Sequence, residues 1–189
     1  MNADLLVYQA KSFYNAYIAL DQLSRDDSDA LLLLFAPLVV NGAFSVELTL
    51  KAILAKNQIE YGREHNLLIL FRMLPESFQQ ELWAYLIEKA PEYAGSEKGL
   101  NELILLSNAF VDWRYAFEGN PVPAIESRFL AAFANAAIRT MFSHYNTDLR
   151  PVAKTESDHA IEQKFRDNRE KCKKINLKMI KKKTKEHQL

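Results

Sequence analysis

The stretch Pro37-Leu-Val-Val-Asn-Gly-Ala-Phe-Ser-Val-Glu-Leu-Thr-Leu-Lys-Ala-Ile-Leu-Ala-Lys-Asn57 decides the fold of this chain of 189 residues. Wound into a helix, it carries apolar side chains around most of its circumference and leaves one narrow polar stripe at Asn41, Ser45 and Thr49. Such a helix is stable only when other elements cover it. The stretch therefore predicts the central, most buried helix of the protein, with Pro37 in its first turn, where no N–H is needed.

The sequence on both sides of this stretch also repeats apolar residues at helical steps of three and four. Polar or proline-containing breaks separate the segments, and Asn66 is placed to cap one of them. Five glycines and six prolines are too few for a turn-rich sandwich or barrel. We expect an all-α fold, an antiparallel bundle of five to six helices. Besides the central helix, helices are expected over about residues 3–24, 67–74, 77–90, 98–118 and 124–149.

The charge of the chain is divided between two regions. Its 24 basic and 24 acidic side chains cancel, but residues 152–189 hold twelve lysines and arginines against six acids, a net of +6. The remaining twelve bases and eighteen acids give the rest of the chain a net of −6. We therefore expect a helical bundle over residues 1–150 and a basic, lysine-rich C-terminal extension over residues 151–189. The extension also carries apolar residues at helical steps, which suits a basic amphipathic helix, and a flexible tail is the alternative.

Eight lysines of this basic extension lie between residues 171 and 185, with no acidic residue among them. Such a run forms a local patch that can engage phosphate groups, so it predicts nucleic-acid binding. Docking onto the acidic bundle of a neighbouring subunit is the competing interpretation. The eight are Lys171, Lys173, Lys174, Lys178, Lys181, Lys182, Lys183 and Lys185.

Several classes of site and location are disfavoured by the sequence. A single cysteine, Cys172, excludes an internal disulfide framework and a multi-cysteine zinc site. A Gly-rich phosphate loop, a His-Glu-x-x-His pair and a Gly-x-Ser-x-Gly turn are all missing, so we expect no metal and no cofactor. The acidic start Met1-Asn-Ala-Asp4 is unlike a secretory signal. The longest apolar run has eleven residues, against roughly 20 in a membrane-spanning helix. We therefore expect a cytoplasmic protein with no membrane partner.

Two neighbouring segments stand out, Phe44-Ser-Val-Glu-Leu-Thr-Leu-Lys51 and Gly62-Arg-Glu-His-Asn-Leu-Leu-Ile-Leu70. They resemble the buried helix ending in Glu-Leu-x-x-Lys, and the Gly/His-x-Leu-x-x-Leu pattern after it, in the HEPN superfamily. The resemblance covers roughly residues 5–149. It implies that His65 closes the loop onto the central helix through a hydrogen bond. Independently, the spacing of Glu47 and Lys51 favours an ion pair along the helix.

Many HEPN proteins are metal-independent ribonucleases of toxin–antitoxin and phage-defence systems, and they act as dimers with an Arg followed after four to six residues by His. By this resemblance, Arg139-Thr-Met-Phe-Ser-His144 holds the catalytic candidates. His144 would move protons at the ribose 2′-hydroxyl, and Arg139 would stabilise charge on the phosphate in a dimer cleft. Five residues along an unbroken helix turn the direction by about 140°, so the two side chains would point apart. A structural histidine beside a surface arginine is the competing interpretation.

A second segment, Phe110-Val-Asp-Trp-Arg-Tyr-Ala-Phe-Glu-Gly119, resembles one in bacterial members of the group and lies about where the family's signature normally falls. It contains Arg114 but no His. Glu118, four residues on, would form an ion pair with Arg114 on one helix face. In an accessory role, Arg114 would meet a phosphate, and Glu118 could replace the missing base only if burial raised its pKa.

The missing His argues that ribonuclease activity has been lost or altered. We therefore expect a non-catalytic HEPN-like module that binds RNA, a nucleotide or a protein partner, and that forms a homodimer. The alternative is a metal-independent endoribonuclease that uses Arg139 and His144.

Overall fold

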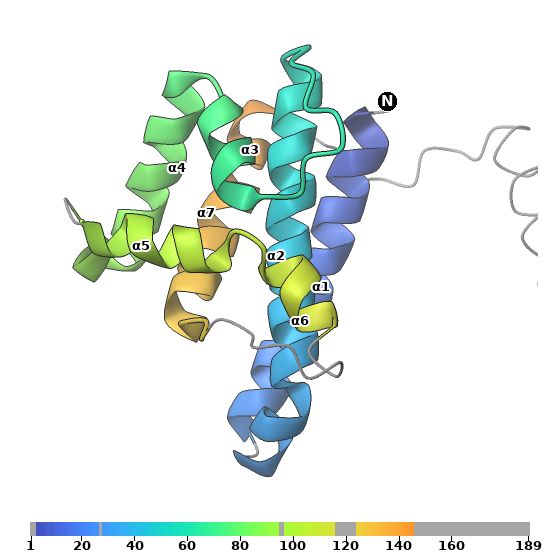
Figure 1. Ribbon diagram of the computed structural model, residues 1–189, viewed down its shortest axis with the longest axis vertical. Helices are drawn as coiled ribbons and strands as arrows, with labels where there is room; N and C mark the ends of the chain where they lie inside the picture. The colour runs from blue at the N-terminus through green and yellow to red at the C-terminus, as the bar shows by residue number, and fades with distance from the viewer. Residues whose placement is uncertain (1–2, 27, 95–96, 116–123, 146–189) are drawn as a thin grey trace, which may run out of the picture. The chain divides into compact units, whose positions relative to one another are not determined.

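The computed structural model describes residues 3–26, 28–94, 97–115 and 124–145, without the side chains of 26–33. These residues form helices and no strand (Figure 1), which confirms the expected all-α fold. A short 3₁₀ turn, η1 (Pro91–Tyr93), separates α4 from α5. The α-helices are α1 (Ala3–Asp26), α2 (Ser28–Lys56), α3 (Leu67–Met73), α4 (Glu76–Lys89), α5 (Glu97–Leu106), α6 (Ala109–Arg114) and α7 (Ser127–His144).

Helix α2 lies at the centre of the core, as its apolar circumference predicts. Val46, Leu50 and Ile53 are fully buried, and α1, α3, α6 and α7 all pack against the helix. Figure 1 shows α1 lying along α2. The polar stripe is satisfied within the helix at Thr49, whose hydroxyl donates to the Ser45 carbonyl at 2.8 Å. A hydroxyl that bonds its own helix can be buried at little cost.

The start of α2 was predicted wrongly. The helix begins at Ser28, so Pro37 lies inside it rather than in its first turn. A proline inside a helix removes one backbone hydrogen bond and costs about 3 kcal/mol. The leucine-rich sequence before Pro37 favours the helix, and packing of α1 against α2 supports it. Four residues after Pro37, the Asn41 side-chain amide donates a hydrogen bond to the Pro37 carbonyl at 2.7 Å.

Helix α2 has a composition that a membrane-spanning helix could also have. Its segment Leu34–Lys56 is the one described stretch that is long and apolar enough to cross a membrane, with a mean hydropathy of 1.5. Within the fold, 78% of the most apolar window of this segment is buried. A core helix covered by its own protein accounts for the same composition.

Helices α3 and α4 begin and end close to the predicted residues. The Asn66 side chain accepts a hydrogen bond from the Ile69 N–H at 3.1 Å, which confirms the predicted cap of α3. Pro75 lies between the two helices, where its missing N–H interrupts neither.

The predicted helix over 98–118 is divided into α5 and α6. The division falls at Ser107, whose carbonyl accepts from the N–H of Leu67 at the start of α3, at 2.9 Å. Asn66 also donates to the Asn108 side chain at 3.1 Å. The first turn of α3 thus takes a carbonyl that a continuous helix would use internally. Helix α6 then turns toward α2, where the Phe110 ring stacks on Phe44 with centroids 4.3 Å apart.

Helix α7 supplies the second large part of the core. It was predicted over about 124–149, and it runs from Ser127 to His144, while residues 146–149 lie outside the described residues. Its buried face is rich in alanine and phenylalanine, including Phe129, Phe133 and Ala137. This face packs against α2 and α4, which brings the polar end of α7 alongside α4.

Candidate functional site

A buried polar cluster joins α2 to the loop that follows it. The Glu47 carboxylate accepts from Lys51 Nζ at 2.7 Å, and His65 Nδ1 lies 2.9 Å from the same oxygen. The Glu47 side chain is only 2% exposed and that of Lys51 only 10%. Both the predicted ion pair and the predicted loop-closing bond of His65 are confirmed.

The surroundings of this cluster make it a structural element. Lys51 Nζ lies 5.5 Å from the centroid of the Tyr61 ring, which covers it. Burial, followed by the negative charge of Glu47, raises the pKa of the Tyr61 hydroxyl. Glu64 holds the loop from the other side, because its carboxylate accepts from the backbone N–H groups of His65 and Asn66. The cluster holds the loop that follows α2 against the helix, and burial makes Glu47 and Lys51 inaccessible to a substrate.

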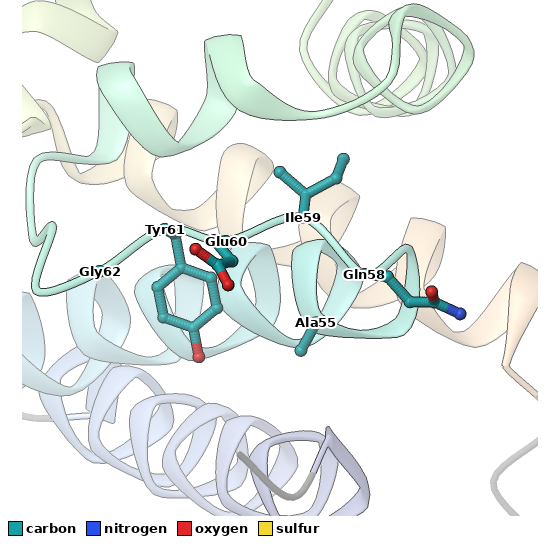
Figure 2. Close-up of a pocket in the computed structure, with 6 residues that line it drawn as sticks. All are labelled: Ala55, Gln58, Ile59, Glu60, Tyr61 and Gly62. Carbon is teal, nitrogen blue, oxygen red and sulfur yellow. The ribbon is translucent and has the colours of Figure 1, made fainter.

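A shallow hollow lies next to this cluster, at the C-terminal end of α2. Figure 2 shows the six residues that line it, from Ala55 to Gly62, with the Tyr61 ring and the Gln58 amide at opposite ends. Its volume is about 350 Å³. Glu60 is the only residue with a formal charge among the six, and none of the candidate catalytic residues is among them. We assign no chemistry to this hollow.

The first catalytic candidate, Arg139, points to α4. Its guanidinium lies 2.8 Å from a carboxylate oxygen of Glu88 and 4.0 Å above the centroid of the Tyr85 ring. Its side chain is 47% exposed. Arg139 is therefore a half-exposed residue that already has a carboxylate and an aromatic ring as partners.

The second catalytic candidate, His144, contacts a different residue of the same helix. His144 Nε2 lies 2.5 Å from one carboxylate oxygen of Glu81, and the Ser143 hydroxyl donates to the other oxygen at 2.5 Å. The imidazole packs on the Phe78 ring with centroids 4.4 Å apart. The side chain of His144 is 41% exposed, so it is neither a core residue nor fully solvated.

Within one chain, Arg139 and His144 do not meet. Their partners Glu88 and Glu81 are seven residues apart on α4, which corresponds to roughly 10 Å along the helix axis. The helical spacing of Arg139 and His144 predicted that their side chains would point apart, but it did not indicate Glu81, Glu88 or Ser143 as partners. No local pattern could reveal these partners, because each contact joins two helices distant in the sequence.

Replacing Glu81 with glutamine is expected to make the free energy of unfolding less dependent on pH in the acid range. Burial raises the pKa of Glu81, but hydrogen bonds from Ser143, His144 and Tyr85 outweigh it, so the pKa lies below the ordinary 4.5. A lowered pKa stabilises the fold above the ordinary value, and this contribution is lost as the pH falls through the lowered one. Urea unfolding between about pH 7 and pH 3 should show Glu81→Gln losing about 1 kcal/mol at neutral pH and less in acid.

The control for this experiment is Glu97→Gln, since Glu97 is exposed on α5 and makes no ion pair with a described residue. Its unfolding profile should follow that of the wild type. If the free energy of unfolding of Glu81→Gln changed with pH in parallel with that of the wild type, Glu81 would not contribute to the pH dependence of stability.

The remaining candidate residues are only partly placed. Helix α6 ends at Arg114, and Glu118 lies outside the described residues, so the expected ion pair between them stays a prediction. The Arg114 guanidinium instead lies 4.7 Å from the centroids of both the Phe110 and Tyr115 rings. The eight lysines of the basic extension also lie outside the described residues. Among the residues that the structure describes, no group of three His, Cys, Asp or Glu could hold a metal.

The fold and the buried cluster define a class of protein, an all-α bundle whose central helix holds a Glu–Lys pair tied to a His of the next loop. The sequence model of the HEPN domain matches residues 38–141, more than half of the 189 residues. The chain therefore belongs to the HEPN family. The match contains Arg114 and Arg139 and ends three residues before His144. Comparisons with curated proteins and with solved structures give no match.

Proposed function

We propose that this chain is a non-catalytic HEPN module that binds RNA. The observation that carries the proposal is the separate engagement of Arg139 by Glu88 and of His144 by Glu81, about two helical turns apart on α4. Cleavage would need both groups at one phosphodiester, the arginine at the phosphate and the histidine at the 2′-hydroxyl. Membership of the HEPN family supports an RNA-related role.

The phosphate contacts in this proposal come from the basic extension. Eight lysines lie between residues 171 and 185 with no acidic residue among them, whereas the first 151 residues carry a net charge of −6. RNA is bound largely through such cations, because each contacted phosphate releases condensed counterions. We infer that the module acts as a homodimer in bacterial defence or toxin–antitoxin biology, as the family resemblance implies.

The proposal is tested by titrating a fluorescently labelled single-stranded RNA with the full chain in EDTA. Anisotropy is measured at about 50 mM and about 200 mM salt, and the length of the RNA is checked at the end. Binding that weakens steeply with salt and leaves the RNA intact supports the proposal. No binding at the lower salt concentration would refute it.

A metal-independent endoribonuclease is the second candidate function. The half-exposed side chains of Arg139 and His144 favour it, because a second subunit could reach both residues. The Glu81 carboxylate also holds the imidazole of His144 in one orientation, as a general base requires. In this alternative the reactive site forms across a dimer cleft, and His144→Ala abolishes cleavage.

A further inference from the structure

A second cavity lies away from all the residues considered so far, where α1, the end of α4 and the start of α7 meet. Its volume is about 360 Å³. Three cationic side chains line it, one from each helix: Arg25, Lys89 and Arg128. One carboxylate, Asp21, is also present. The remaining lining residues are small: Ala90, Ser127, Ala131 and Ala132.

The charge of this cavity is opposite to that of the bundle around it. Three cations and one carboxylate line it, and the Glu92 carboxylate pairs with Arg128, so the formal net charge is +1, from 3 minus 2. The first 151 residues together carry −6. Because Asp21 and Glu92 pair with the two arginines, Lys89 carries the charge that a bound anion would balance.

The two arginines of the cavity are held in place by carboxylates. Arg25 Nε and Nη2 each lie 2.9 Å from one Asp21 oxygen, and Arg128 Nε lies 2.6 Å from Glu92. A guanidinium has five N–H donors, so each arginine keeps donors for a further acceptor. Holding the planar group in one orientation also lowers the entropy cost of binding a ligand.

Lys89 is exposed, as both arginines are, but unlike them it makes no ion pair with a described residue. The cavity also opens at the N-terminus of α7, where Ser127 is the first helical residue. The side chain of the cap residue, Glu126, makes no capping hydrogen bond. The positive end of the helix dipole therefore adds to the field of the three cations.

We propose that this cavity binds a phosphate monoester. The monoester carries about −1.5 to −2 charges at neutral pH, and the cavity, counted with Glu92, has a formal net charge of +1. Arginine forks favour planar, bidentate contact with phosphate oxygens, and lysine adds a point charge. A volume of about 360 Å³ lies at the lower end of the range of small-molecule sites, which suits a phosphate with a small organic group. The proposal is independent of RNA binding by the basic extension, since it uses other residues.

The test is an NMR titration of the full chain with inorganic phosphate at constant ionic strength, with chloride as the balancing anion. The backbone amide signals of Ser127 and Arg128 are expected to shift saturably. In Lys89→Gln the dissociation constant should rise at least fivefold. The matched control is Arg63→Gln, which removes the same charge from an exposed loop residue outside the cavity and should bind phosphate as the wild type does.

Two sources could supply the monoester, a free metabolite or the 5′ end of an RNA. A nucleoside 5′-monophosphate that binds as tightly as, or more tightly than, inorganic phosphate identifies the metabolite. An RNA that binds more tightly with a 5′-phosphate than with a 5′-hydroxyl, and loses this difference in Lys89→Gln, identifies the RNA end. Either result supports the site. Shifts that do not saturate, or an equal loss of affinity in Lys89→Gln and Arg63→Gln, would overturn it.

Discussion

Replacing Glu47 with alanine is expected to lower the free energy of unfolding by about 3–5 kcal/mol. The substitution leaves the Lys51 ammonium in a site where its side chain is only 10% exposed. It also removes the acceptor of His65, so the loop after α2 loses its attachment. An unpaired buried charge is costly because water can no longer solvate it and no opposite charge replaces the water. Urea denaturation, read from the midpoint at constant m-value, measures this loss.

Two further variants separate the buried charge from simple loss of volume. Glu47→Leu combined with Lys51→Met removes both charges at similar volume and should recover most of the stability. Arg25→Ala breaks another pair at spacing i, i+4, but its side chain is 71% exposed, so it should cost less than about 1 kcal/mol. Equal losses in Arg25→Ala and Glu47→Ala would show that burial does not decide the strength of the pair.

Replacing the eight lysines of the basic extension with glutamine is expected to lower the affinity for single-stranded RNA about a thousandfold at low salt. The slope of log affinity against log salt for a single strand is about −0.7 for each phosphate neutralised, so eight engaged lysines would give nearly −6. The variant should bind weakly and with little dependence on salt. The measurement is RNA anisotropy over a series of salt concentrations.

A pair of double variants controls for net charge in this experiment. Lys181→Gln/Lys182→Gln should make the salt slope shallower by about 1.4. Arg63→Gln/Arg72→Gln removes the same charge from exposed residues of the bundle and should leave the slope unchanged. If the two pairs had the same effect, the extension would not be the RNA-binding segment.

Local sequence patterns predicted the parts of the fold that local physics controls. The apolar circumference of α2 indicated its central burial, and Asn66 was recognised as a helix cap. The pairing of Glu47 with Lys51 followed from their spacing on one helix. In each case the deciding interaction lies within a few residues along the chain, or depends only on how much of a helix is apolar.

Two incorrect predictions concern where helices begin and end. Pro37 lies inside α2, although local propensity places a proline in a first turn. The break between α5 and α6 depends on a hydrogen bond from Leu67, forty residues earlier in the chain, to Ser107. A periodicity of three and four continues across this break, so the pattern alone could not show it.

The partners of the candidate catalytic residues also could not be predicted from local sequence. A sequence motif identified Arg139 and His144 as candidates. The positions of their side chains depend on Glu88 and Glu81, which belong to no motif. A motif identifies residue types at a spacing, whereas catalysis requires that the side chains converge. The contacts with α4 support the binding module that the missing His beside Arg114 had already favoured.

We propose that this HEPN module binds RNA without cleaving it. The most direct test incubates total RNA with the full chain in EDTA, with the wild type and His144→Ala side by side, and measures the RNA length on a denaturing gel. We predict full-length RNA with both proteins. Cleavage by the wild type that disappears in His144→Ala would contradict the account and establish the ribonuclease.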